Sequence, residues 1–228
     1  MAEGRQLLAI YDLDRTVSWR PTYSLFLLKS AALIAPARLL LVPLVPLLMI
    51  AHKLGAFDRD QLKSAMWAVM LGRVPAARMA RAIDAFTAAT LARNIRPGAR
   101  AQIERDRADG ARLVLATAAH EVYAAPIARQ LGFDFVVATQ VRVGDDGRVG
   151  PGLAGANVYG NSKLAAVEQF LIREALVRDG LAVRFYSDSS SDRPVFEWAD
   201  EPMAVNPSRK LARLAAERGW PVADWQRP

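Results

Sequence analysis

Short apolar runs that each stop at a polar cluster recur along the chain, with helix-like segments between them. The runs that predict strands are residues 6–11 (QLLAIY), 112–116 (RLVLA), 134–139 (DFVVAT) and 182–187 (AVRFYS), with a shorter one at 202–205 (PMAV). The helical patterns are residues 99–109, 120–131 and 162–178. This alternation predicts an α/β fold, a Rossmann-like parallel sheet flanked by helices, with ligands bound beyond the carboxyl ends of its strands.

One long segment interrupts the alternation. Residues 18–95 have helical patterns throughout, and the Arg96-Pro97-Gly98 turn marks a return to the sheet. We therefore expect residues 1–17 and 96–228 to form an α/β core and residues 18–95 to form an all-helical cap inserted into it. The sequence VRVGDDGRVG at residues 141–150 predicts a hairpin within the core.

The most apolar stretch of the protein lies in the predicted cap, at residues 31–51 (AALIAPARLLLVPLVPLLMIA). Three prolines and Arg38 interrupt it, and the uncharged part is shorter than the roughly 18 to 20 residues that a spanning helix needs. One interpretation is a buried pair of cap helices broken at the prolines. The other is a peripheral membrane contact through residues 31–53, helped by Lys29, Arg38 and Lys53.

Composition limits the chemistry. The 228 residues are 52% hydrophobic and 23% charged, which suits a folded chain. There is no cysteine and there are only two histidines, so a bound metal is expected to have oxygen ligands. The net charge of +7 favours anionic partners, but the basic residues are dispersed along helices, which argues against nucleic-acid binding. The N-terminus lacks the plan of a signal peptide, so we expect a cytoplasmic protein.

Polar residues that can carry chemistry follow the predicted strands. They are Asp12 and Asp14 after the first strand, Thr117 after the second, Asp188 and Asp192 after the run at 182–187, and Lys163 at the start of a helix. Any one of these aspartates could merely cap a helix. Together they would place four carboxylates at one edge of the sheet, where they cannot all stay ionised without a cation. Mg²⁺ is the cation that suits such oxygen ligands.

These residues resemble the four motifs of the haloacid dehalogenase (HAD) superfamily of hydrolases. The motifs are Asp12-Leu13-Asp14-Arg15-Thr16, an apolar strand ending at Thr117, Lys163, and Asp188-Ser189-Ser190-Ser191-Asp192. The helical insertion after the first motif is similar to the cap of subfamily IB, the group around phosphoserine phosphatase. The resemblance covers nearly the whole chain.

The resemblance implies a mechanism and assigns roles. Asp12 would attack phosphorus to give an aspartyl-phosphate, and Asp14 would protonate the leaving group and then activate water. The metal-site residues would be Asp12, Asp14 through its backbone carbonyl, Asp188 and Asp192, the last through water or by holding Lys163. Thr117 and Lys163 would bind the phosphoryl oxygens.

The substrate is less constrained by the sequence. Residues 17–22 contain no acidic side chain to hold the ammonium group of phosphoserine. The apolar, proline-broken cap resembles that of HAD-type phosphatidylglycerophosphate phosphatases, which implies a lipid phosphate. The alternatives are a soluble phosphatase acting on a small metabolite such as histidinol phosphate, with the apolar surface forming a dimer contact or core, and a non-catalytic regulatory protein on the same scaffold.

Overall fold

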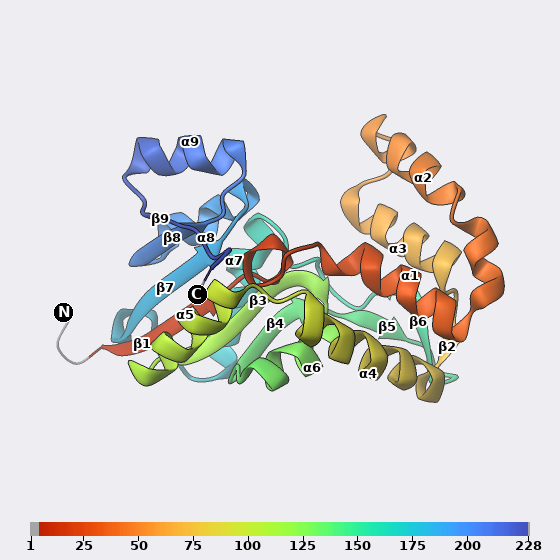
Figure 1. Ribbon diagram of the computed structural model, residues 1–228, viewed down its shortest axis with the longest axis horizontal. Coiled ribbons are helices and arrows are strands. Elements are labelled where there is room, and N and C mark those ends of the chain that lie inside the picture. The colour runs from red at the N-terminus through yellow and green to blue at the C-terminus, as the bar shows by residue number, and fades with distance from the viewer. Residues whose placement is uncertain (1–4, 228) are drawn as a thin grey trace.

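The computed structural model describes residues 5–227, and its centre is a six-stranded parallel sheet (Figure 1). The strands are β1 (Gln6–Tyr11), β3 (Arg112–His120), β4 (Phe135–Thr139), β7 (Leu181–Ser187), β8 (Glu201–Val205) and β9 (Val222–Ala223), in the spatial order β4-β3-β1-β7-β8-β9. The α/β fold and five of these strands confirm the prediction. The sequence analysis missed β9, whose two residues continue the sheet beyond β8.

Helices cover both faces of this sheet because its strands alternate their apolar side chains. Ala9 and Tyr11 of β1 pack on the side of α5 (Pro97–Ala108) and α6 (Glu121–Leu131). Leu8 and Ile10 face the opposite way, in a second cluster. Its helices are α7 (Asn161–Arg173), α8 (Arg193–Trp198) and α9 (Arg209–Arg218).

The helix predicted at residues 162–178 was too long at its C-terminus. Helix α7 ends at Arg173, and Ala175 adopts a left-handed conformation with φ of 52°. A single left-handed residue cannot continue a right-handed helix, so the chain turns there toward β7.

The predicted cap contains helices α1 (Thr22–Ile34), α2 (Leu44–Lys53), α3 (Arg59–Met70) and α4 (Ala76–Arg93). A short turn at Pro36–Leu41 separates α1 from α2, as the prolines predicted. The chain leaves and re-enters the core at one place, where Ser18 pairs with Ile95. This bridge lies at the two boundaries of the cap that we propose for residues 18–95.

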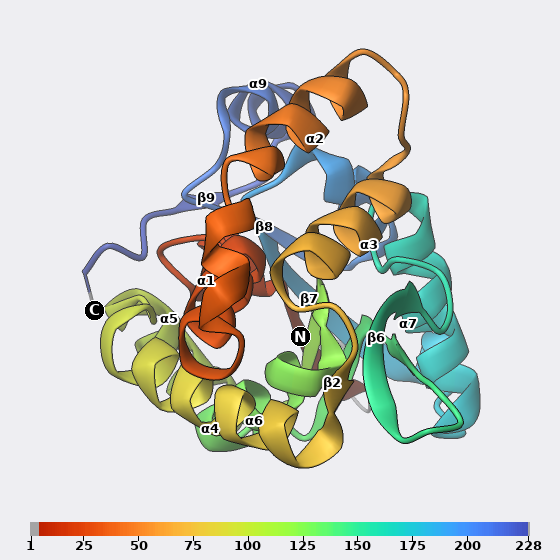
Figure 2. The ribbon, with the colours of Figure 1, turned by 90° about the vertical axis from the view of Figure 1, so that its right-hand side faces the viewer.

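The same segment also contains a short strand, so it is not helical throughout as we expected. Strand β2 (Val74–Pro75) pairs antiparallel with β6 (Arg148–Leu153), which forms the predicted hairpin with β5 (Val141–Val143). Figure 2 shows β2 and β6 side by side below α3. Two residues are too few to show the alternation by which a strand is recognised in a sequence.

The apolar stretch does not form a fully buried pair of helices, because none of the residues of α2 is buried. Several leucines of the stretch are exposed, Leu40 to 83% of its surface. None of the helices in residues 5–227 combines the length and the apolar character needed to cross a membrane.

The sheet core gives a first prediction. Phe185 of β7 is fully buried and meets Phe196 edge to face, with ring centroids 4.9 Å apart. Phe185→Ala should lower the free energy of unfolding by about 3–5 kcal/mol, measured by urea denaturation, because it leaves a cavity. Ile172→Ala, at a side chain that is 72% exposed, is the control and should change it by less than about 0.5 kcal/mol. Equal losses in the two variants would contradict the packing described.

Candidate active site

The predicted site residues meet at the carboxyl ends of β1, β3 and β7, beside the start of α7. All six line one cavity of about 400 Å³ between the core and the cap helices, together with residues of α1, α2 and α3. The structure therefore brings together the residues that the sequence placed at one edge of the sheet: Asp12, Asp14, Thr117, Lys163, Asp188 and Asp192.

The first motif turns sharply after β1. The Asp12 N–H donates to the carbonyl of Tyr186 at 2.9 Å, so Asp12 still belongs to the ladder between β1 and β7. Arg15 then adopts a left-handed conformation with φ of 64°, which is rare for a residue other than glycine. The Asp14 carboxylate accepts hydrogen bonds from the Thr22 N–H and hydroxyl, both at 2.7 Å, at the first turn of α1. The start of the cap thus orients Asp14.

Lys163 connects two of the carboxylates. Its Nζ lies 2.8 Å from Asp12 Oδ1 and 2.7 Å from Asp192 Oδ2, and the side chain is only 2% exposed. Gly160, with φ of 60°, precedes the helix that carries this lysine. The left-handed backbone favours glycine at that position. The buried ammonium thus ties the end of β1 to the segment after β7.

Asp188 is held by the first motif. Its N–H donates to Thr16 Oγ1 at 2.9 Å, and the same oxygen lies 3.4 Å from a carboxylate oxygen of Asp12 and of Asp188. Asp192 accepts a hydrogen bond from the Ser187 hydroxyl at 2.6 Å. Ser187, which directly precedes the fourth motif, therefore orients Asp192, and Thr16 of the first motif orients Asp188.

Thr117 is buried, and its hydroxyl oxygen accepts the Ala119 N–H at 3.0 Å. This bond uses the oxygen as an acceptor and leaves the hydroxyl proton available for an anion in the cavity.

Burial changes the protonation of the carboxyl groups. It raises the pKa of Asp12 to about 7 and that of Asp188 to about 6, while the Lys163 ammonium opposes the shift at both. The pKa of Asp14 is also raised, chiefly by burial, against the hydrogen bonds from Thr22. The pKa of Lys163 is raised because Asp12 and Asp192 together outweigh its desolvation. Burial thus favours the neutral form of these carboxyl groups more than Lys163 favours their ionised form.

The donor set fits Mg²⁺. Asp12 and Asp188 direct oxygens toward the same threonine, and one carboxylate oxygen of Asp192 is buried with no hydrogen-bond partner among the described residues. No group of three acidic or imidazole side chains in residues 5–227 is arranged to chelate an ion unaided. Mg²⁺ typically takes one or two carboxylates and fills its shell with waters and substrate phosphate, so such a sparse set suits it.

One residue of this cavity escaped the sequence analysis. Lys63 of α3 reaches into it and donates to the carbonyl of Ala118 at 2.6 Å and to Asn157 Oδ1 at 3.0 Å. Lys63 stands in the helical spacing of the buried Met66, Trp67 and Met70. A lysine within the apolar stripe of an amphipathic helix was the available signal.

A family model described as haloacid dehalogenase-like hydrolase matches residues 9–197. The chain belongs to this family. The match spans all four motifs and the proposed cap, and it agrees with the parallel sheet and with the position of the site at its carboxyl edge.

Curated relatives include phosphatases. Protein CicA of Caulobacter vibrioides is 32% identical over 197 residues, 86% of this chain and 84% of that protein. A histidinol-phosphatase of Neisseria meningitidis is 29% identical over 143 residues, 62% of this chain and 64% of that protein. The chain spans less than two thirds of the length of several curated relatives.

Solved structures extend the comparison to the fold. A protein of unknown function from Bordetella pertussis superposes with a TM-score of 0.86 at 28% identity, covering 97% of this chain and 99% of that one. A phosphoserine phosphatase, solved with an analogue of its phospho-aspartyl intermediate, gives 0.65 at 16% identity, with coverage of 99% and 95%. The similarity to the phosphoserine phosphatase concerns the fold alone.

Lys63 gives a prediction for the pH dependence of stability. Burial lowers the pKa of its ammonium from 10.5 to about 8, so between pH 8 and 10.5 the unfolded chain binds more protons than the folded one. The free energy of unfolding from this group therefore rises with pH across that window. Wild type should gain up to a few kcal/mol relative to Lys63→Met between pH 7.5 and 10, measured by urea denaturation. If the free energies of unfolding of the two proteins had the same pH dependence, the prediction would be wrong. Lys210→Met, at an exposed lysine, is the control and should follow the wild-type pH dependence.

Proposed function

We propose that the protein is a Mg²⁺-dependent phosphomonoester hydrolase that works through an aspartyl-phosphate on Asp12. The observation that carries the proposal is the position of the Asp12 carboxylate, held between Lys163 and Thr16 at the end of β1 and open to the cavity. A carboxylate fixed in this way can attack phosphorus in line and divide one difficult displacement into two easier ones.

Asp14 is the proposed acid and base. Its raised pKa favours a carboxylic acid that can protonate the leaving alkoxide. After that transfer, the carboxylate can take a proton from the water that hydrolyses the acyl phosphate. The hydrogen bonds from Thr22 fix the orientation of this side chain at the cavity wall for both transfers.

The remaining residues bind the phosphoryl group and balance its charge. The Lys163 ammonium and the Thr117 hydroxyl line the cavity and can donate to phosphoryl oxygens. Asp192 holds Lys163 in place. Asp12, Asp188 and the backbone carbonyl of Asp14 would hold Mg²⁺, which when bound would offset the charge of the phosphoryl group.

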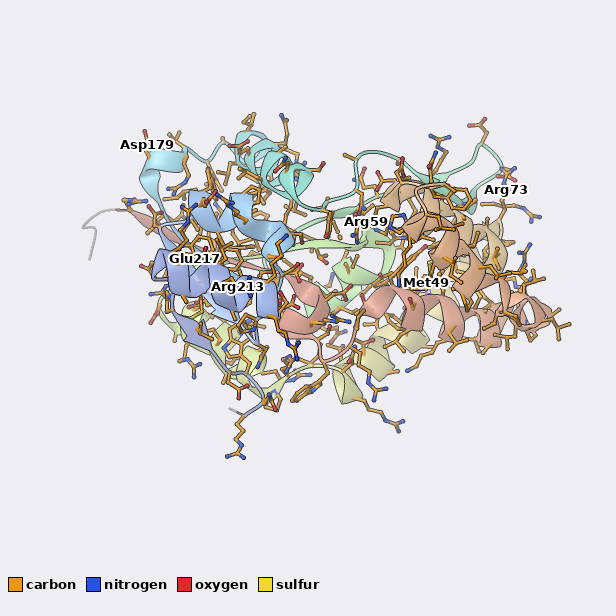
Figure 3. The ribbon with its side chains drawn as sticks, turned by 90° about the horizontal axis from the view of Figure 1, so that it is seen from above. Met49, Arg59, Arg73, Asp179, Arg213 and Glu217 are labelled. Carbon is orange, nitrogen blue, oxygen red and sulfur yellow. The ribbon has the colours of Figure 1, made fainter. Side chains whose placement is uncertain are left out.

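The proposed chemistry predicts how three variants behave. With Mg²⁺ the purified protein should release phosphate from p-nitrophenyl phosphate, and chelation by EDTA should stop it. Asp12→Asn should lower kcat by at least about 10³-fold, because an amide is a poor nucleophile. Asp14→Asn should also lower kcat, and its requirement for Mg²⁺ should equal that of the wild type. Asp179→Asn, on an exposed turn at the far end of the core (Figure 3), is the control. Turnover by Asp12→Asn at the wild-type rate would refute the proposal.

For the substrate we propose a lipid phosphate, such as phosphatidylglycerophosphate, whose headgroup carries a second anionic group. The cavity is lined by three cations besides Lys163, namely Arg15, Arg59 and Lys63, and its acidic lining among the described residues consists of the four motif aspartates. Because all four aspartates belong to the motifs of the proposed chemistry, the charged side chains left to meet the rest of the substrate are cations, which favour an extra phosphate over an ammonium group. Methionine and leucine side chains of the cap add an apolar wall: Met49, Leu62 and Met66.

The second candidate is a small soluble phosphomonoester. The similarity to a histidinol-phosphatase favours it, and a cavity of about 400 Å³ suits a small metabolite or a headgroup rather than whole acyl chains.

A comparison of the two substrate classes tests which kind of phosphomonoester the protein prefers. Values of kcat/KM for phosphatidylglycerophosphate in mixed micelles should exceed those for a panel of soluble phosphomonoesters by at least about tenfold. Lys63→Met should lower this preference more than it lowers turnover of p-nitrophenyl phosphate, which has no second anionic group. A soluble ester that is preferred by the same margin would establish the second candidate instead.

A further inference from the structure

The outer surface of the proposed cap is apolar and has no partner within the described chain. Helix α2 has no buried residue, and the turn before it also has none. We call the exposed apolar surface of α1, this turn and α2 the leucine face. Its most exposed members are Leu40, Leu47, Ile50, Met49 and Leu33, and we include Leu54, which directly follows α2. Exposed large apolar side chains gathered on neighbouring elements are typical of a binding surface.

The charge around the leucine face has a single sign. The sequence has no acidic residue between Asp14 and Asp58, whereas Lys29, Arg38 and Lys53 all lie on these elements. Lys29 and Lys53 are exposed. The surface therefore combines leucines with positive charge, as do surfaces that lie on anionic bilayers.

A basic cavity adjoins this face at the turn between α1 and α2. Its volume is about 490 Å³ and it is lined by four arginines, Arg38, Arg73, Arg78 and Arg148. Asp146, the one carboxylate paired with them among the described residues, is shared by Arg73 and Arg148. Guanidinium groups in excess of carboxylates suit phosphate, which they can bind with two hydrogen bonds at once.

We propose that the leucine face and the adjoining arginine cavity dock the protein on an anionic phospholipid bilayer. The leucines would enter the boundary between headgroups and acyl chains, and the arginine cavity would take a lipid phosphate. No described helix can span the bilayer, so the helices lie along its surface.

A second copy of the chain fits this face less well. A two-fold dimer through the leucine face would bring two sets of Lys29, Arg38 and Lys53 to one interface. The face itself has no acidic residue to offset that repulsion. An anionic bilayer offsets it directly.

Helix α2, which carries much of the leucine face, also contributes to the active-site cavity. Met49 of α2 is 48% exposed and also lines that cavity beside Asp12. Figure 3 shows Met49 and Arg59 on the side of the cap nearest the core, whereas Arg73 lies at its far end. A docked protein would therefore receive a lipid headgroup at the cavity mouth; this link rests on the proposed function, whereas docking itself does not.

Vesicle flotation tests the proposal. The protein should float with phosphatidylcholine vesicles that contain phosphatidylglycerol and remain below with phosphatidylcholine alone. Leu40→Glu/Leu47→Glu and Lys29→Glu/Lys53→Glu should each lower the bound fraction more than about tenfold. The controls are Ile172→Glu/Val177→Glu and Arg209→Glu/Lys210→Glu, which place the same changes at exposed sites of the core and should float as wild type does.

Absence of flotation with anionic vesicles would overturn the proposal. So would a stable dimer in light scattering that dissociates in Leu40→Glu/Leu47→Glu, because the face would then be a contact between copies. Equal loss of flotation in the control variants would also overturn it, since binding would not be specific to this face.

Turnover measurements separate this inference from the proposed function. Asp12→Asn should float as wild type does, since docking does not use the nucleophile. The leucine variant should keep wild-type turnover of p-nitrophenyl phosphate and lose at least about tenfold in kcat/KM for lipid phosphate presented in vesicles. Flotation without any phosphatase activity would support docking and reject the proposed function alone.

Discussion

The buried contact of Lys163 with Asp12 and Asp192 is the interaction on which the site depends. It joins the end of β1 to the segment that follows β7, across a sheet whose strands are far apart in sequence. A buried ammonium and two carboxylates are costly to desolvate. They are stable in the interior because the ammonium donates a hydrogen bond to each carboxylate and offsets its charge. Loss of the lysine would leave the carboxylates uncompensated at the position where we propose that the phosphate binds. The three side chains that join these two segments are thus also part of the proposed chemistry.

The proposed cap contributes to the site because the chain enters it immediately after the first motif. The residue that orients Asp14 is Thr22, in the first turn of α1. Lys63 of α3 closes the opposite side by contacts with Ala118 and Asn157 of the core. Any movement of these helices would therefore alter the environment of Asp14 as well as access to the cavity, so cap closure would be coupled to the proposed proton transfer.

The sequence was sufficient for the features with strong local signals. The alternation of apolar strands and amphipathic helices predicted the sheet, and strand ends located Asp12, Thr117 and Asp188. Features defined by tertiary pairing escaped it, because β2 and β9 each have two residues and no periodicity of their own. Lys63 escaped because its position on α3 becomes informative only when the buried face of that helix is known.

The proposed mechanism requires a covalent aspartyl-phosphate at Asp12. Its most direct test is to mix the enzyme and Mg²⁺ with excess p-nitrophenyl phosphate, quench with acid during turnover, and map the digested protein by mass spectrometry. The account predicts a phosphoryl group on the peptide that contains Asp12 and none on that peptide in Asp12→Asn. Phosphate release at the normal rate with the phosphoryl group on another residue would contradict it.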